Sequence, residues 1–413
     1  MQDGINKDII EEQYINHPYP EPIDDLLMHI NKSLYVEHAG LDIVWHKLFP
    51  EKEYNENIDI LIAGCGTNQA PYHALKFPNS NIYAIDVSDT SINHVKKMIE
   101  KYNIKNLEIE KKDIIDLKDD QKFDYTISTG VIHHTANPQL SLNKIVDVTK
   151  ADGGLYIMVY ANYLRHGVYY LQDFFRYLGI KQNKLGLDVI KKIIGGLPKD
   201  HYVNNYIKIV NNNSRDLSYD AGIIDTFLNA RDVSYDIFSL KELIDKSGAF
   251  FQCWMDNNNF WRDFLDFSKI HELQQNLDAL NPWERADLTQ KFQPNAGKFS
   301  FTLRKNKKFE HMWFDKKMLN SNIYAYKHNM YKDIKPINEI ENSGGSVGFN
   351  DLEVKLSIKE RVLWNNLDNK ISKILELTNG QLRKMDYENF NETELTETLH
   401  SLWLRGRIDF AYF

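Results

Sequence analysis

The segment Asp59-Ile-Leu-Ile-Ala-Gly-Cys-Gly-Thr-Asn68 is an apolar run that ends directly in two glycines, Gly64 and Gly66. Such a run is typical of a buried parallel strand, and glycine permits a close approach of the backbone to a neighbouring group. The pattern therefore predicts a turn at which a cofactor meets the edge of a sheet. Two glycines can also serve packing alone at such a corner, so the turn by itself leaves both interpretations open.

The residues after this turn narrow the choice of cofactor. Gln69 stands where the G-x-G-x-x-G fingerprint of dinucleotide-binding proteins has its third glycine, which disfavours a pyrophosphate ligand. Asp86 ends the next predicted strand, twenty residues beyond Gly66. A carboxylate at that position can accept hydrogen bonds from both hydroxyls of a ribose. The combination predicts a cofactor that contains a ribose.

Asp113 follows the third predicted strand, and two interpretations of it stay open. Its carboxylate can accept the exocyclic amine of an adenine while Ile114 packs on the ring. Aspartate is also a preferred N-cap of helices. The two roles are compatible with each other.

From residue 58 onward, short apolar runs alternate with amphipathic segments, which is typical of a parallel sheet covered by helices. We expect a doubly wound, Rossmann-like α/β sheet of seven strands that ends in an antiparallel hairpin. The predicted strands are residues 58–63, 81–85, 107–111, 125–129, 154–160, 250–255 and 298–304, and the predicted helices between them include 91–102, 139–148 and 239–246.

The other parts of the chain predict three additions to this sheet. Residues 1–50 are expected to form a helical cap, and the main domain, 51–305, carries a helical insertion at about 161–235. Residues 306–413 are expected to form a small α+β, winged-helix-like domain with a loop at 342–349. Its predicted elements are helices 357–367, 370–377 and 391–403 and a strand at 407–410.

Composition excludes several classes of protein. A net charge of −8 argues against a dedicated nucleic-acid binder, and helix 391–403 is acidic, so contact with a protein or a homodimer is the better hypothesis for the C-terminal domain. Two cysteines are too few for a disulfide framework, and no run approaches the roughly 18 apolar residues of a membrane span. We therefore expect a cytoplasmic protein without a membrane partner.

The sequence Thr129-Gly-Val-Ile-His-His134, after the fourth predicted strand, completes the pattern. Together with the glycine turn, Asp86 and Asp113, it resembles the class I S-adenosylmethionine-dependent methyltransferases. The resemblance is to the small-molecule, type 11/12-like branch, whose fourth strand ends in a similar His-His turn. It covers residues 55–160 well and extends weakly to 305.

The resemblance implies S-adenosylmethionine as the cofactor and S-adenosylhomocysteine as its product. It also implies the contacts of the cofactor, one residue at a time. These are Ala63, Gly64, Gly66 and Thr67 at the turn, Thr129 and Gly130 beneath the methionine, Asp86 on the ribose, and Val87, Asp113 and Ile114 around the adenine. Lys150, Ala151 and Asp152 stand where many relatives have a proline before a double glycine.

The tandem histidines suggest either catalysis or structure. His133, His134 and Tyr160 are the candidate catalytic residues, with packing or substrate positioning as the alternative for the histidines. No metal is expected, because adjacent side chains point in different directions and the sequence supplies no recognisable further ligand. The candidate substrate contacts are Tyr14, Tyr19, Asn162 and His166, whereas Arg165 is interpreted as a polar helix entry.

The predicted reaction is direct displacement of the methyl group to an oxygen, nitrogen or sulfur atom of a small molecule. Such a reaction needs proximity, alignment and a desolvated pocket, and a base only where the nucleophile carries a proton. Two alternatives stay open: a protein-directed methyltransferase, and a non-catalytic cofactor-binding module that regulates a partner.

Overall fold

The computed structural model describes two compact units. The residues described are 8–32, 34–35, 37–120, 122–213, 216–255, 276, 279–292, 294–306, 322–328, 337–338, 355–404 and 407–412. The first unit comprises Met1–Ala39, Glu56–Phe251 and Gln290–Asn306, and the second comprises Gly40–Asn55, Gln252–Thr289 and Lys307–Phe413. The predicted loop at 342–349 lies outside the described residues.

A seven-stranded sheet with the order β3-β2-β1-β4-β5-β7-β6 confirms the predicted fold. The pairs from β3 to β5 are parallel, whereas β7 is antiparallel to β5. The strands are β1 (Asp59–Ala63), β2 (Asn81–Asp86), β3 (Leu107–Lys111), β4 (Phe123–Thr129), β5 (Thr149–Tyr160), β6 (Phe250–Trp254) and β7 (Lys298–Arg304). The carboxyl ends of β1, β2, β4 and β5 therefore meet at one edge of the sheet.

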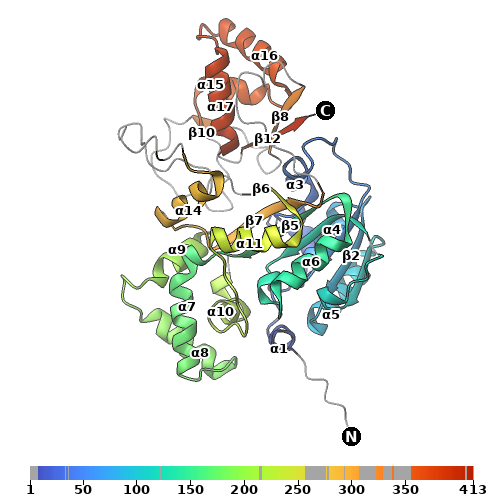
Figure 1. Ribbon diagram of the computed structural model, residues 1–413, viewed down its shortest axis with the longest axis vertical. Helices are drawn as coiled ribbons and strands as arrows, with labels where there is room; N and C mark the ends of the chain where they lie inside the picture. Colours follow the sequence, from blue (N-terminus) through green and yellow to red (C-terminus); the bar gives the residue numbers. More distant parts are fainter. Residues whose placement is uncertain are drawn as a thin grey trace. The chain divides into compact units, whose positions relative to one another are not determined.

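The helices between the strands have the local signals that their sequences predict. Helix α5 (Asp89–Tyr102) begins after the N-cap Ser88 and ends at Asn103, whose backbone is left-handed. Helix α6 (Pro138–Val148) packs against α11 (Ile237–Ser247), and the two lie side by side in Figure 1. Helix α4 (Gln69–Lys76) follows the glycine turn, and short 3-10 turns occupy Ile114–Asp116 and Ile132–His134.

The N-terminal residues divide between the two units, which differs from the predicted single cap over 1–50. Helix α1 (Ile9–Asn16) packs on α5, and α2 (Leu26–Asn31) packs on α4. Helix α3 (Leu41–Leu48) belongs to the second unit instead. Its Lys47 forms a buried ion pair with Asp409, with the Nζ and Oδ1 atoms 2.9 Å apart.

The stretch after β5 folds as a helical group with its own core. Its helices, drawn in green in Figure 1, are α7 (Asn162–Tyr177), α8 (Lys184–Gly195), α9 (Val203–Asn213) and α10 (Asp220–Phe227). Buried side chains such as Val168, Phe175, Ile190 and Phe227 fill the space between them. The segment returns to the sheet at Tyr235, whose backbone N–H donates to Tyr160 O.

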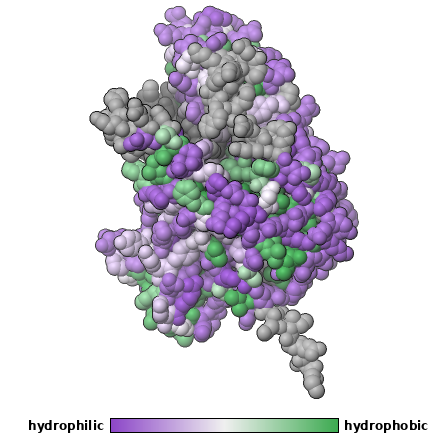
Figure 2. All heavy atoms as spheres, in the orientation of Figure 1, coloured by the Kyte–Doolittle hydropathy of each residue, from purple (hydrophilic) through white to green (hydrophobic). Residues whose placement is uncertain are grey.

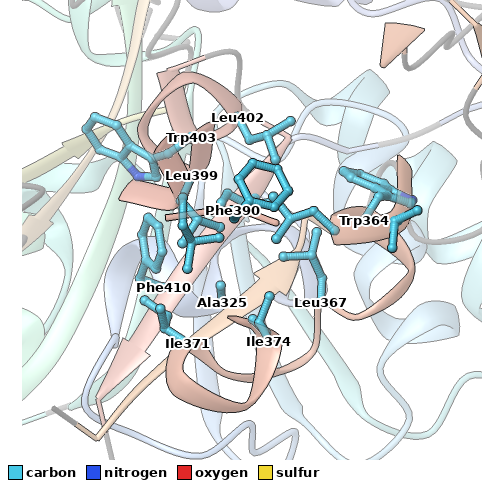
Figure 3. Close-up of a cluster of buried hydrophobic side chains, with 14 of the residues drawn as sticks. Ala325, Trp364, Leu367, Ile371, Ile374, Phe390, Leu399, Leu402, Trp403 and Phe410 are labelled. Carbon is cyan, nitrogen blue, oxygen red and sulfur yellow. The ribbon is translucent and has the colours of Figure 1, made fainter. Parts of the chain in front are cut away.

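The second unit has a separate core around a small sheet with the order β11-β8-β12 (Figure 3). The predicted helices and final strand are present as α15 (Ile358–Asn365), α16 (Ile371–Lys384), α17 (Glu392–Leu404) and β12 (Ile408–Tyr412). The winged-helix arrangement is not confirmed. The remaining elements are α14 (Pro282–Phe292), β8 (Ile323–Lys327), β9 (Ile337–Asn338), β10 (Lys355–Leu356) and β11 (Asn369–Lys370).

Hydrophilic residues cover most of the face shown in Figure 2, and hydrophobic residues form small separate groups on it. Within the described ranges, no helix is long and apolar enough to cross a membrane.

Candidate functional site

The turn after β1 has the backbone that its glycines predict. Gly64 and Gly66 have φ angles of 80° and 54°, in the left-handed region that side chains disfavour. The N–H groups of Gly64 and Cys65 both donate to Ile85 O, at 2.9 and 3.0 Å, which ties the turn to the end of β2. A Cβ on Gly64 would lie 2.4 Å from a methyl carbon of Val131. Packing therefore demands glycine at position 64 with or without a ligand.

Asp86 lies beside this turn with a fixed carboxylate. Its Oδ2 accepts from Gly66 N–H and its Oδ1 from Ser88 N–H, each at 2.9 Å. Burial raises the pKa of Asp86, and these backbone hydrogen bonds oppose the rise. Each carboxylate oxygen has two acceptor sites, and the backbone hydrogen bonds from Gly66, Ser88 and Val87 leave capacity for a ribose hydroxyl. The contact of Asp86 with a ribose stays a prediction.

Residues 14–23 lie along the same edge of the sheet. The Thr67 hydroxyl donates to Pro20 O at 2.7 Å, and the Ser88 hydroxyl donates to Tyr14 O at 3.0 Å. A Cβ on Gly66 would lie 3.0 Å from Tyr19 O. The N-terminal segment thus follows the cofactor-side turns closely, as expected for a cover over that edge.

The end of β4 is linked to the turn by Gln69, the residue that replaces the third glycine. Its side-chain amide donates to Glu37 Oε2 at 3.0 Å and to the Thr129 hydroxyl at 3.1 Å. Burial raises the pKa of Glu37. Gly130 follows with a φ of 74°. Glu37 is distant in sequence from the other motifs, and no local pattern marks it.

The residues predicted to surround the adenine are Val87, Asp113 and Ile114, and they differ in burial. Asp113 is exposed and caps the 3-10 turn that follows, with its Oδ1 accepting from Ile115 N–H at 3.2 Å. The N-cap interpretation is therefore confirmed. Ile114 is buried and Val87 is half-buried. Their contact with an adenine stays a prediction.

A second group of polar side chains surrounds Asp225 at the end of β5. The Tyr14 hydroxyl donates to Asp225 Oδ1 at 2.9 Å, and the Tyr160 hydroxyl donates to its Oδ2 at 3.0 Å. The Asn229 amide also donates to Oδ1. Burial raises the pKa of both tyrosines, and the Asp225 charge adds to the effect. These phenols therefore act as neutral hydrogen-bond donors.

Arg165, interpreted from sequence as a polar helix entry, lies in the first turn of α7, and its side chain joins this group. Its side chain is 3% exposed, and its Nη2 atom lies 3.2 Å from Asp232 Oδ2. Its guanidinium carbon lies 3.8 Å from the ring centroid of Tyr160, in cation–π contact. A second hydrogen bond runs to the Tyr206 hydroxyl at 3.0 Å. A charge this well satisfied holds Tyr160 and Asp232 in place.

His133 and His134 lie against the same group. Their ring centroids are 4.1 Å apart, and the His133 centroid is 4.1 Å from that of Tyr160. Burial lowers the pKa of His133 well below its usual value, with smaller contributions from His134 and Arg165. Atoms of both histidines and of Asp232 lie within 4.8 Å of one another. The expectation from sequence was that adjacent histidine rings point apart and that no further metal ligand lies nearby. The structure contradicts both points.

The predicted substrate residues do not all converge. Tyr14 and Tyr19 lie on the N-terminal segment, and Tyr19 stacks on Tyr219 with centroids 6.3 Å apart. Asn162 is half-buried at the start of α7, whereas His166 is exposed on the same helix. Sequence reasoning missed the acidic residues of the insertion, since no spacing signal connects them to the strand ends.

Comparison with known proteins agrees with this geometry. Residues 54–184 match a family described as a methyltransferase domain. An uncharacterised protein of Synechococcus is 24% identical over 63% of this chain and 63% of its own length. A probable (S)-tetrahydroprotoberberine N-methyltransferase of Papaver bracteatum is 24% identical over 35% of this chain and 44% of its own length. The chain thus covers less than two thirds of each of these relatives.

The structure of PKMT2 from Rickettsia typhi has a similar fold, with a TM-score of 0.61 at 17% identity. The match covers 90% of this chain and 74% of that one. The same protein in complex with AdoHcy gives a TM-score of 0.60 at 15% identity. At this level of identity the likeness is one of fold.

Proposed function

Because residues 54–184 belong to the class I S-adenosylmethionine-dependent methyltransferases, we propose that this chain transfers the methyl group of S-adenosylmethionine to a small-molecule nucleophile. S-adenosylhomocysteine is then the second product. The observation that carries the proposal is the Asp86 carboxylate, fixed beside the glycine turn by the N–H groups of Gly66 and Ser88.

The donor set of this edge fits the cofactor. Asp86 would accept the ribose hydroxyls, and the left-handed turn at Gly64 and Gly66 would approach the methionine part. Thr129 and Gly130 would lie beneath that part. Bound here, the sulfonium supplies an electrophilic methyl carbon. The protein's residues supply alignment and exclude water.

The acceptor is placed at the group around Asp225. Tyr14 comes from the N-terminal segment, Tyr160 from β5 and Asp225 from the insertion, so three separate parts of the first unit meet at this position. Convergence of several segments favours a small acceptor. The Papaver relative is named as an N-methyltransferase, which supports a nitrogen nucleophile.

The chain's own residues would act mainly by positioning. Tyr160 is held by Arg165 below its ring and by Asp225 at its hydroxyl, so its orientation is fixed before an acceptor arrives. A base at His133 or His134 stays a prediction, since displacement needs one only for a protonated nucleophile. The cytoplasmic location, the absence of a nucleic-acid partner and a homodimer through residues 306–413 also stay predictions.

The test examines binding of the methyl donor and the class of the methyl acceptor in two separate experiments. Calorimetry of the full chain with S-adenosylmethionine and with S-adenosylhomocysteine is expected to show binding of both. Methyl-labelled cofactor is then incubated with the protein and a cell extract divided into small-molecule and protein fractions. Label in the small-molecule fraction supports the proposal, and label in the protein fraction alone identifies a protein acceptor. Absence of heat with either nucleoside would refute the donor assignment.

A further inference from the structure

His133, His134 and Asp232 form a cluster of polar side chains beside the proposed acceptor position. Within the part of the chain that the structure describes, both ring nitrogens of His133, Nε2 of His134 and Oδ1 of Asp232 are buried and have no hydrogen-bond partner. An unsatisfied buried polar group costs about 1–3 kcal/mol. Four such atoms in one place indicate a ligand.

The geometry of these atoms suits a metal ion. One nitrogen from each histidine and one oxygen from Asp232 lie within 4.8 Å of one another. Tetrahedral ligands at roughly 2.0–2.1 Å from a zinc ion lie about 3.4 Å apart, so small rotations of the side chains would close the set. Two imidazoles and a carboxylate are ligands that divalent transition metals accept.

The surrounding hydrogen bonds resemble the support that metal ligands receive. The Nδ1 atom of His134 lies 2.7 Å from Arg231 O, so an N–H at Nδ1 would leave the lone pair of Nε2 directed at the cluster. The other carboxylate oxygen of Asp232, Oδ2, accepts from Arg165 at 3.2 Å and from Gln172 at 3.3 Å. Such partners fix the ring tautomer and the orientation of the carboxylate in metal sites.

The charges near the cluster permit a cation. An imidazole binds a metal ion in its neutral form, and binding displaces the proton of a charged ring. Arg165 is positive and opposes a second cation. Its charge is shared between Asp232 and the phenols of Tyr169 and Tyr206, and Asp225 supplies a further carboxylate close by.

We propose that His133, His134 and Asp232 form a binding site for one divalent transition-metal ion. Three protein ligands leave at least one coordination position for water or for an oxygen or nitrogen atom of an acceptor. The site rests on the geometry of the first unit and is independent of the proposed methyl transfer.

The test uses the full chain after removal of metals with a chelator. Titration with Zn²⁺ in a competing chelator, followed by elemental analysis, is expected to give one ion per chain. Co²⁺ in its place is expected to give the intense visible absorption of a four-coordinate site. His134→Gln and Asp232→Asn should each weaken Zn²⁺ binding by at least about tenfold, which is the lower limit for loss of even a supporting partner.

His73→Gln is the matched control, because His73 is also buried with both ring nitrogens lacking a hydrogen-bond partner among the described residues. Its ring lies against Tyr72 and Phe77. This variant should bind Zn²⁺ as the unchanged protein does. Circular dichroism establishes that each variant is folded, and calorimetry with S-adenosylhomocysteine tests the methyl-donor site separately.

Two results would overturn the metal site. One is the absence of stoichiometric Zn²⁺ binding by the unchanged protein. The other is equal binding by His134→Gln, Asp232→Asn and the control, which would assign the ion to another place. Neither result bears on the nucleoside calorimetry, so failure of the metal site and failure of the methyl donor are distinguishable.

Discussion

Replacing Asp86 by alanine should weaken binding of S-adenosylhomocysteine by about two orders of magnitude. Hydrogen bonds to charged groups contribute roughly 1.5–3 kcal/mol each. Loss of a single one corresponds to about 10–150-fold in the dissociation constant, since 1.4 kcal/mol is tenfold. The carboxylate already accepts from Gly66 and Ser88 in the free protein, so the variant also frees two backbone donors at the turn.

Asp86→Asn separates these effects, because the amide oxygen keeps one acceptor while the charge is lost. We expect its affinity to lie between those of the unchanged protein and Asp86→Ala. Isothermal calorimetry at one pH and salt concentration measures the dissociation constant of S-adenosylhomocysteine for the unchanged protein and for each variant. Asp119→Ala, at an exposed aspartate paired with Lys144, is the control and should bind normally. Equal affinity of Asp86→Ala and the control would refute the ribose assignment.

Three further predictions concern stability. Gly64→Ala should lower the free energy of unfolding by about 1–3 kcal/mol more than Gly179→Ala in urea unfolding, because both glycines are left-handed but only the first would overpack a neighbour. Lys47→Met should cost roughly 3–5 kcal/mol in the same assay by leaving Asp409 buried without its main cation, and an unchanged midpoint would contradict this. Burial lowers the pKa of His328 to about 4. The neutral ring therefore contributes its full stability above pH 6.5, the usual pKa of histidine, and this contribution is lost as the pH falls to about 4. In thermal melts over this range, the melting temperature of His328→Gln should fall less steeply with decreasing pH than that of the unchanged protein.

The fold of the proposed cofactor edge could be predicted from sequence because its signals are local, whereas the contacts with the cofactor stay a prediction. The two glycines and Asp86 lie at the ends of the adjacent strands β1 and β2. The apolar run to Ala63 indicates a strand, and the glycines after it indicate a turn, without knowledge of the rest of the fold. The N-cap role of Asp113 follows from the same kind of signal.

The acceptor side could not be predicted, because tertiary packing creates it. Asp225 lies within a helix and 65 residues from Tyr160, whose hydroxyl it binds. Arg165 is buried where α7 packs on α9 and where Tyr160 and Asp232 meet its guanidinium. The same reason applies to α3, since nothing in residues 41–48 indicates that they pack with β12 rather than with the helices before them.

Tyr14 connects these two sides, and its position explains why an N-terminal segment with little pattern of its own matters to the site. Its backbone oxygen accepts from Ser88, two residues after Asp86, while its hydroxyl donates to Asp225 in the insertion. Its ring also meets His134 edge-on, with centroids 6.4 Å apart. A shift of this segment would therefore disturb the proposed cofactor side and the proposed acceptor side together. Tyr14 reaches Asp225 only while the segment also packs against the turn after β2.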